Sequence, residues 1–291
     1  MLSLRDIRKR IRAVESTKQI TKTMEMVAAA RLRKAQQQIE SFRPYARKMQ
    51  EMLAHLSEAS GAVEHPYFEQ REGNKVALVV ISSDRGLCGS YNSNIFRRTN
   101  LWVADHPDLD VGLILIGKKA INFYKRRDYK ILGSYRDFDG KFDIGKVRQI
   151  TNDLSEMFIS GDVDRIVFIY TAFLSMASFR ITETQFLPIR AEFEEAVEKE
   201  EYAAAKEYIF EPDPETIFKQ LLPSYALVLV QMAVADAIAS EHGTRMLAMG
   251  SATKNAGEMI EQLTLQRNKA RQASITSELL EIVSGAEALN K

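Results

Sequence analysis

The sequence is poor in the residues that build covalent cross-links and metal sites. It has one cysteine, Cys88, among 291 residues, which excludes an intrachain disulfide and a metal cluster held by cysteines. The four histidines stand at positions 55, 65, 106 and 242, without the short spacing of metal ligands. The sequence therefore predicts no metal site and no cofactor, and its low cysteine content is typical of a reducing compartment.

Long apolar runs and an excess of one charge are also missing. We find no apolar stretch of signal-peptide type and no run long enough to span a bilayer. Lys and Arg number 40 and Asp and Glu 39, a net charge of +1, whereas general nucleic-acid binders usually carry a basic excess.

The balanced total hides a segregation of charge along the chain. Residues 1–50 hold thirteen Lys or Arg and four Asp or Glu, which is 13 − 4 = +9, and residues 191–215 hold two and ten, which is 2 − 10 = −8. We expect the basic end to meet an acidic partner.

Residues 1–60 carry the pattern of one long helix. Ser3 and Asp6 form a capping box, no glycine occurs before Gly61, and we expect the one proline, Pro44, to bend the helix. A heptad seam follows, which turns polar in its middle. One set of seam positions is Leu4, Ile11, Lys18, Glu25, Leu32, Ile39, Ala46 and Leu53, and the other is Ile7, Val14, Thr21, Ala28, Ala35, Phe42, Met49 and Leu56. Such a helix is roughly 85 Å long at 1.5 Å per residue, a length typical of coiled coils.

The middle of the chain changes period. Continuous apolar runs predict buried strands, and helical segments lie between them, which together indicate a small α/β domain with a largely parallel sheet. The expected strands are 76–81, 111–116 and 165–170, with an edge strand at 182–187, and the expected helices are 92–104, 118–127 and 144–159.

The C-terminal region returns to a helical period. Asp213 is a candidate N-cap, Pro214 suits the first helical position, and we expect Pro223 to interrupt this helix. A second seam then comprises Tyr225, Val228, Met232, Ala235, Ala239, His242, Met246, Met249, Thr253, Ala256, Ile260 and Leu263. Beyond Leu263 the apolar residues leave this seam, so we expect the helix to leave its partner there and to enter another protein's surface.

These patterns predict an α/β fold combined with a coiled coil. The long N- and C-terminal helices form an antiparallel coiled coil, and the small α/β domain is inserted between them. The expected divisions are residues 1–60 for the first helix, 75–190 for the inserted domain, 191–212 for an acidic connection and 213–286 for the second helix, which pairs with the first.

No motif in the sequence predicts a catalytic residue. Residues 82–89 lie between a strand and a helix, where a phosphate could bind, but they match neither nucleotide-binding pattern, so a tight structural turn is the simpler interpretation. Nothing points to a base beside Cys88 that would make it a nucleophile. The basic face of residues 5–34 could contact nucleic acid, yet it lacks interleaved aromatic residues, and an acidic protein partner explains it as well.

Three stretches resemble the gamma subunit of F-type ATP synthases. The first comprises Ile7–Ile11 and Thr17–Ala29, the second is Ser83–Gly89, and the third comprises Ser240–His242, Arg245–Met249, Leu263–Thr276 and Glu281–Ala286. The resemblance is tight near both ends and at the turn motif Asp84, Arg85, Gly86, Leu87, Cys88 and Gly89, and it is loose from Asn94 to Ala239.

The resemblance implies a central rotor shaft without catalytic residues. The shaft couples proton-driven rotation of a membrane ring to conformational change at the catalytic beta subunits. The implied partners are the alpha and beta subunits, the epsilon subunit and the membrane c-ring, with no nucleic acid and no small-molecule substrate. The implied location is peripheral, on the cytoplasmic face of the bacterial plasma membrane. A coiled-coil scaffold with a non-catalytic α/β domain, and an enzyme built on that domain, are the alternatives.

The resemblance also implies residues that touch partners. Contacts to beta-subunit loops are expected from Met24, Arg245, Arg271 and Gln272. A basic patch suited to acidic tips of the beta subunit comprises Arg8, Lys9, Arg10, Arg12, Arg31, Arg33 and Lys34.

The chain departs from the family at a row of glycines in the second helix. Gly243 and Gly250 stand where the family usually has bulkier residues, and Gly257 follows one heptad later. Each costs about 1 kcal/mol relative to Ala in a helix interior. Drift on an exposed face is the simpler interpretation, and a bare strip for close contact is the alternative.

Overall fold

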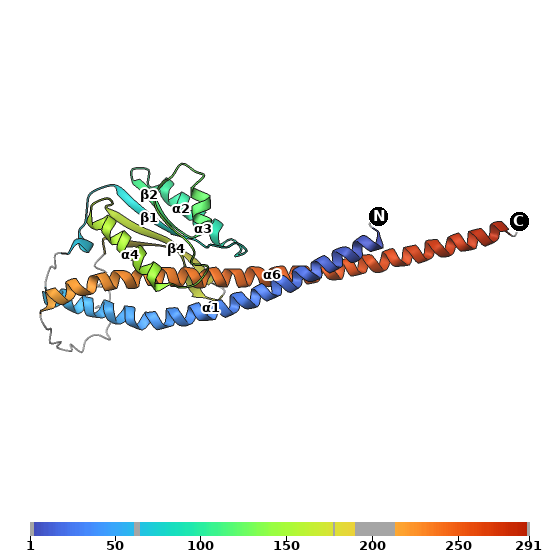
Figure 1. Cartoon of the computed structure of the whole chain (residues 1–291), viewed down its shortest axis with the longest axis horizontal. Helices are drawn as coiled ribbons and strands as arrows, with labels where there is room; N and C mark the ends of the chain where they lie inside the picture. The colour runs from blue at the N-terminus through green and yellow to red at the C-terminus, as the bar shows by residue number, and fades with distance from the viewer. Residues whose placement is uncertain (1–2, 61–64, 177, 190–212, 290–291) are drawn as a thin grey trace. The chain divides into compact units, whose positions relative to one another are not determined.

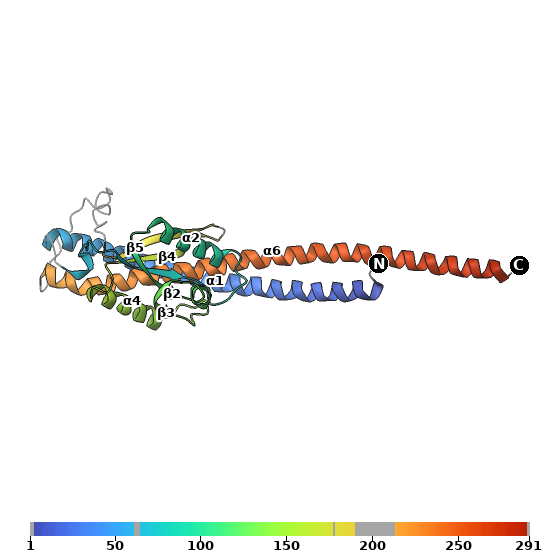
Figure 2. The same cartoon turned by 90° about the horizontal axis from the view of Figure 1, so that it is seen from above.

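The computed structural model describes residues 3–60, 65–176, 178–189 and 213–289. They form two compact units, one of Met1–Ala28 with Arg245–Lys291 and one of Ala29–Thr244. The long helices α1 (Leu4–Ser60) and α6 (Pro214–Leu289) each contribute to both units (Figures 1 and 2). The expected acidic connection, 191–212, lies outside the described residues.

The smaller unit is a pair of antiparallel helices. Helix α1 begins at the predicted capping box, where the Ser3 hydroxyl donates to the Asp6 carboxylate at 2.7 Å and accepts from the Asp6 amide at 3.2 Å. The seam residues Ile7, Ile11 and Ala28 are buried, as the heptad pattern predicts.

The larger unit contains a five-stranded sheet in the order β3-β2-β1-β4-β5. Its strands are β1 (Lys75–Ile81), β2 (Asp110–Ile116), β3 (Lys130–Tyr135), β4 (Arg165–Ser175) and β5 (Ser178–Leu187). Every pairing is parallel except that of β4 with β5, which confirms the prediction of a largely parallel sheet.

Helices cover both faces of this sheet. Helices α2 (Tyr91–Asp105) and α3 (Lys118–Tyr124) lie on one face, and α4 (Ile144–Ile159) and the part of α6 in this unit lie on the other (Figure 1). A short 3-10 helix, η1 (Pro66–Phe68), precedes β1. The central strand β1 is buried from Val76 to Ile81 because both of its faces are covered.

The structure corrects three details of the sequence prediction. Strand β3 was not expected. Helix α3 ends at Tyr124 rather than at residue 127. Pro223 does not interrupt α6, which is continuous from Pro214 to Leu289; its side chain is exposed, and the flanking Leu222 and Tyr225 are buried. Packing of the neighbouring turns therefore keeps the helix intact despite the hydrogen bond that proline removes.

One stretch of α6 is apolar enough, by length and composition, to cross a membrane. Its mean hydropathy is 1.7, so by this criterion the expectation that no run is long enough to span a bilayer is wrong. Of this stretch, 56% is buried inside the protein, as in a helix that packs on a sheet.

Candidate functional site

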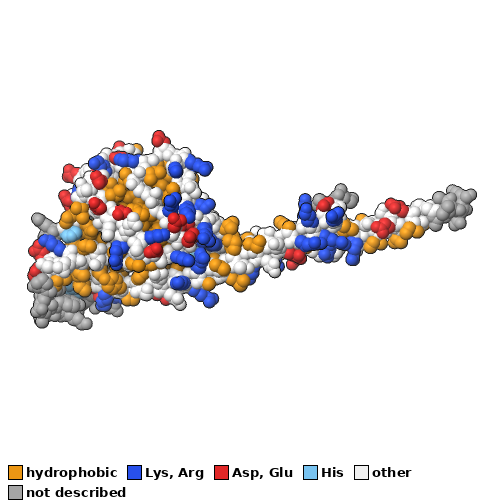
Figure 3. Space-filling model, in the orientation of Figure 1, with side chains coloured by type: hydrophobic (Ala, Val, Ile, Leu, Met, Phe, Trp, Pro, Cys, Tyr) orange, Lys and Arg blue, Asp and Glu red, His pale blue; other side chains and the backbone are white. Residues whose placement is uncertain are grey.

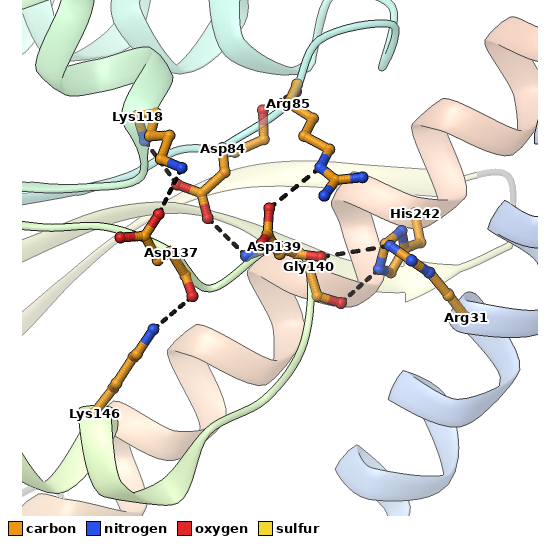
Figure 4. Close-up of polar contacts among 10 residues, drawn as sticks. Arg31, Asp84, Arg85, Lys118, Asp137, Asp139, Gly140, Lys146 and His242 are labelled. Carbon is orange, nitrogen blue, oxygen red and sulfur yellow. Dashed lines mark hydrogen bonds and ion pairs between the residues drawn. The ribbon is translucent and has the colours of Figure 1, made fainter.

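The predicted turn motif lies between β1 and α2 and connects three loops. The carboxylate of Asp84 accepts from the amide of Lys118, at the start of α3, at 2.9 Å and from the amide of Asp139, between β3 and α4, at 2.7 Å. The guanidinium of Arg85 pairs with Asp139 at 3.2 Å (Figure 4). The side chains therefore fix loops at the carboxyl ends of β1, β2 and β3 to one another.

The remaining residues of the motif shape its backbone and core. Leu87 and Gly89 have positive φ angles of 61° and 57°, which suits glycine and strains leucine. Cys88 is buried, and its sulfur accepts from the side-chain Nδ2 of Asn92 at 3.3 Å. A buried thiol held in this way is a core residue rather than an exposed nucleophile.

The loop between β3 and α4 is the second part of this polar cluster. Three of its residues have positive φ angles: Asp137, Asp139 and Gly140. The ammonium of Lys118 pairs with the Asp137 carboxylate at 2.5 Å, and this hydrogen bond lowers the pKa of that carboxyl. Arg31 of α1 donates to the carbonyl of Asp139 at 3.4 Å (Figure 4).

The crevice where α/β sheets usually bind ligands is filled in this chain. Such sheets bind ligands beyond the carboxyl ends of their strands, where the strand order reverses. Here α6 occupies that place with Val234, Ala237 and Ile238, and the cavity left against Ile81 and Tyr91 is about 20 Å³. This volume holds about one water molecule, so the crevice has no room for a nucleotide.

A more open groove of about 720 Å³ lies beside the turn, between α2 and α3. Apolar side chains such as Phe96, Leu101 and Phe123 line it, with Arg97 and Lys119 as its charged groups. Among its lining residues there is no carboxylate that could act as a general base. Within the described residues, no group of three or more His, Cys, Asp or Glu could hold a metal ion.

The helical unit contains the polar part of the predicted seam. Thr253 of α6 donates to the hydroxyl of Thr21 of α1 at 2.9 Å. On either side of this pair, a charged side chain lies over a glycine of the facing helix, Glu25 over Gly250 and Lys18 over Gly257. The carboxylate of Glu25 and the ammonium of Lys18 lie over these glycines, so two ionic groups occupy seam positions without full burial.

The same contacts give the register of the two helices. In an antiparallel pair, residues at the same level have numbers with a constant sum. The numbers of Glu25 and Gly250, and those of Lys18 and Gly257, each add up to 275, so Leu4 lies level with residue 275 − 4 = 271. The expectation that α6 leaves its partner at Leu263 is therefore wrong, because the seam residues Ile7 and Ile11 are still buried. Helix α6 loses its partner near Arg271, where α1 begins.

The four residues expected to touch beta-subunit loops all lie in the helical unit. Met24 is half-buried, and Arg245 is only 9% exposed. Arg271 and Gln272 are exposed on α6, at the level where α1 begins. Beyond them the apolar side chains of Ile275, Leu279, Leu280, Ile282 and Val283 are exposed as well.

The residues of the expected basic patch differ in their surroundings. Arg8, Lys9, Arg10 and Arg12 are exposed on the first turns of α1, where Figure 3 shows Lys and Arg side chains gathered. Within the part of the chain that the structure describes, none of these four pairs with a carboxylate. In the other unit Arg33 and Lys34 are exposed, whereas Arg31 is half-buried by its contact with Asp139.

Comparisons with known proteins agree with this architecture. The family model described as ATP synthase matches residues 3–289. The ATP synthase gamma chain of Desulfitobacterium hafniense is 43% identical over 289 residues, which cover 99% of this chain and 100% of that protein. The gamma chain of Heliobacterium modesticaldum is 43% identical over 291 residues, with the same coverage of both chains.

Solved structures with a similar fold come from mitochondrial ATP synthases. A chain of the central stalk and c-ring structure from Tetrahymena thermophila has a TM-score of 0.61 and 26% identity, and the match covers 80% of this chain and 99% of that one. A chain of the Euglena gracilis enzyme has a TM-score of 0.66 over 98% of this chain and 94% of that one, and its 21% identity indicates the fold alone.

Proposed function

Because the chain belongs to the ATP synthase gamma chain family, we propose which of its parts do the work of a central rotor shaft. The chain is a non-catalytic subunit of an F-type ATP synthase, a membrane-associated complex, and forms its central stalk. The coupling of rotation to catalysis must therefore run through contacts with other subunits rather than through chemistry in this chain.

The free end of α6 is the observation that carries this proposal. From residue 275 to residue 285 every side chain is exposed, and Ile282 is 67% exposed. A helix that exposes this many large apolar side chains without a partner marks an interaction site. We propose that this end turns inside the ring of alternating alpha and beta subunits, whose inner surface covers it.

Rotation can drive catalysis only through contacts that differ between shaft angles. A shaft that bound every beta conformation equally would shift no population, whatever its affinity. We propose that Met24, Arg245, Arg271 and Gln272 make angle-dependent contacts with beta-subunit loops. The exposed cations from Arg8 to Arg12, together with Arg33 and Lys34, would attract acidic tips of the beta subunits. The half-buried Arg31 contributes less, because it already contacts Asp139.

The α/β domain would face the membrane side of the complex. We propose that it contacts the epsilon subunit and the c-ring, and that the complex lies on the cytoplasmic face of the bacterial plasma membrane. The filled crevice supports a role in protein contacts, since it leaves no room for a nucleotide beyond the carboxyl ends of the strands.

Reconstitution tests this assignment. Alpha and beta subunits assembled with this chain should sustain ATP turnover, and complexes that also contain the epsilon subunit and the membrane sector should pump protons when given ATP. The same preparation without this chain should pump none. Equal pumping with and without the chain would contradict the proposed function.

A further inference from the structure

The α/β domain grips α6 within a single stretch of two turns, from Ala237 to Gly243. Four different parts of the domain take part: the start of α2, strand β4, strand β5 and the loop between β3 and α4. The contacts are Tyr91 hydroxyl to Ala237 carbonyl at 3.1 Å, Ser240 hydroxyl to Thr171 carbonyl at 2.9 Å, His242 Nε2 to Gly140 carbonyl at 2.7 Å, and the Phe179 ring against Gly243.

His242 inserts its ring into a space left by a glycine of the domain. The ring is buried, and its Nε2 donates to the carbonyl oxygen of Gly140 (Figure 4). A Cβ atom at Gly140 would lie 2.6 Å from the ring, and the φ angle of +66° at this position also disfavours other residues. The projecting side chain therefore belongs to the helix, and the space that receives it belongs to the domain.

The next residue reverses this arrangement. Gly243 lies under the ring of Phe179 from β5, and a Cβ atom there would lie 2.6 Å from the ring carbon Cζ. Here the projecting side chain belongs to the domain, and the space that receives it belongs to the helix. The interpretation of Gly243 as drift on an exposed face is therefore wrong, because the residue is buried beneath an aromatic ring.

Adjacent residues of a helix point about 100° apart, since 3.6 residues make a turn. The two ring-and-glycine pairs therefore hold different sides of α6. Turning the helix about its axis, or sliding it along that axis, would drive at least one ring into backbone. Close-packed interiors resist such displacement and transmit strain.

The loop that carries Gly140 is itself held in place. The carboxylate of Asp84 binds the amide of Asp139 next to it, and Lys146 donates to the carbonyl of Asp137 at 2.5 Å. The family's turn motif thus supports one side of the grip.

We propose that His242 and Phe179 are positioning residues for rotary coupling, the contacts through which the α/β domain passes torque to α6. This inference rests on the proposed function, because torque matters only in a rotor. It assigns a mechanical role to two side chains that lie on different elements and form one grip.

A double-mutant cycle tests the geometry in the full-length chain. Gly243→Ala should lower the stability, because the added methyl group meets the Phe179 ring. In a Phe179→Ala background the same change should raise the stability, because alanine is the better helix former. Equal effects of Gly243→Ala in both backgrounds would show that the ring does not fill this space, and the proposed grip would be wrong.

A coupling measurement tests the mechanical role. Assembled complexes in vesicles are compared for ATP hydrolysis and for ATP-driven proton pumping, with Phe179→Ala/His242→Ala against a control of Leu174→Ala/His106→Ala. Leu174 lies in the same β4-β5 hairpin but is 53% exposed, and His106 is exposed at the C-cap of α2. We expect the grip variant to keep hydrolysing ATP while it loses pumping out of proportion, and the control to keep the wild-type ratio.

The possible results separate the two proposals. An unchanged ratio of pumping to hydrolysis in the grip variant would overturn this inference, while pumping that still requires the chain would leave the proposed function intact. A shaft that only lost stability would lower both activities together. If the double variant does not assemble, Phe179→Leu, which keeps an apolar side chain, is compared in the same way, and an unchanged ratio there is again the contradicting result.

Discussion

The surroundings of Asp236 in the folded chain disfavour the charged form of its carboxyl. It is half-buried on α6 within the larger unit, and burial raises the pKa of its carboxyl to about 6, an effect that Arg43 of α1 partly opposes. In turn, burial and then the charge of Asp236 raise the pKa of Tyr170 on β4. At neutral pH the folded chain therefore holds a charge that the unfolded chain would hydrate better.

Replacing this carboxyl should stabilise the chain in a pH-dependent way. The folded-state pKa lies above the ordinary value of 3.8, so the folded state binds the proton more tightly and stability falls as pH rises from about 4 to about 6. Asp236→Asn removes the charge at every pH, and it should raise the free energy of unfolding at pH 8 by on the order of 1–3 kcal/mol and by little at pH 4.

Urea unfolding of the full-length chain at the two pH values measures this difference. Asp108→Asn, at an exposed position, serves as the control. It should not raise the free energy of unfolding at either pH. An equal gain from Asp236→Asn at pH 4 and pH 8 would mean that its carboxyl does not titrate as described.

Gly250 differs from Gly243 although both belong to the same row of glycines. A Cβ atom at Gly250 would lie 3.6 Å from the carboxyl carbon of Glu25, an ordinary contact. Gly250→Ala should therefore raise the stability of the chain by up to about 1 kcal/mol, measured by thermal unfolding. A loss comparable to that of Gly243→Ala would show that the two helices pack more closely at this point.

At the scale of residues, sequence alone could identify surfaces but not partners. The heptad pattern predicted that Thr21 lies on the seam, and local signals predicted the caps at Ser3 and Asp213. The contact of His242 with Gly140 joins positions 102 residues apart. No local pattern links them, because the pairing depends on how the sheet and α6 pack. The heptad pattern therefore places His242 on the seam but does not identify Gly140 as its partner.

At the scale of elements, the central strands were predictable and one edge strand was not. Strands β1, β2 and β4 lie inside the sheet and consist of continuous apolar runs because helices cover both faces. Strand β3 lies at the edge, with Gly133 in its middle and no residue buried. Without full burial it needs no apolar run, so its sequence resembles a loop.

A proline substitution tests whether helix α1 is continuous through its middle. Ala28 is 2% exposed in the middle of the helix, and Ala28→Pro should cost about 3 kcal/mol or more by removing a hydrogen bond and clashing with the preceding turn. The melting temperature and the yield of assembled complex should fall more than for Ser83→Ala, which removes one buried hydroxyl.

Ala28→Ser is the control that distinguishes the effect of a changed side chain from the effect of a broken helix. It adds a polar atom at the same site without breaking the helix. Its effect should be smaller than that of proline. Wild-type assembly and melting of the proline variant would contradict a continuous helix through this position.

At the scale of the whole molecule, the sequence predicted the order of the parts from the change of period along the chain. The division into residues 1–60, 75–190, 191–212 and 213–286 follows helix and strand patterns, whereas packing divides both long helices near Ala28 and Thr244. Periodicity reports which residues form an element, but not which neighbours that element packs against along its length.

A chain whose sheet crevice is filled by its own helix should hydrolyse no ATP. The purified chain should show no turnover above a blank, measured by phosphate release. Turnover that persists through purification and falls with Asp84→Ala would contradict this expectation, because Asp84 lies beside the filled crevice.

The assembled complex allows a test of the contacts that bear torque. Arg271 and Gln272 are exposed where α6 loses its partner helix, so their donors can reach loops of a surrounding ring. A hydrogen bond from arginine to a carboxylate is among the stronger kinds, and one that forms at only some shaft angles discriminates between beta conformations. Arg271→Ala/Gln272→Ala should therefore lower ATP turnover per assembled complex.

The isolated double variant should keep its helical content, because alanine is the better helix former, and circular dichroism checks this. Asn268→Ala/Lys269→Ala is the matched control: both side chains are exposed on the same stretch of α6, and the pair likewise includes one cation. If contacts of this stretch were generic, the two double variants would lose turnover equally. A larger loss for Arg271 and Gln272 assigns the coupling to these two side chains, whereas wild-type turnover in that variant would refute their role.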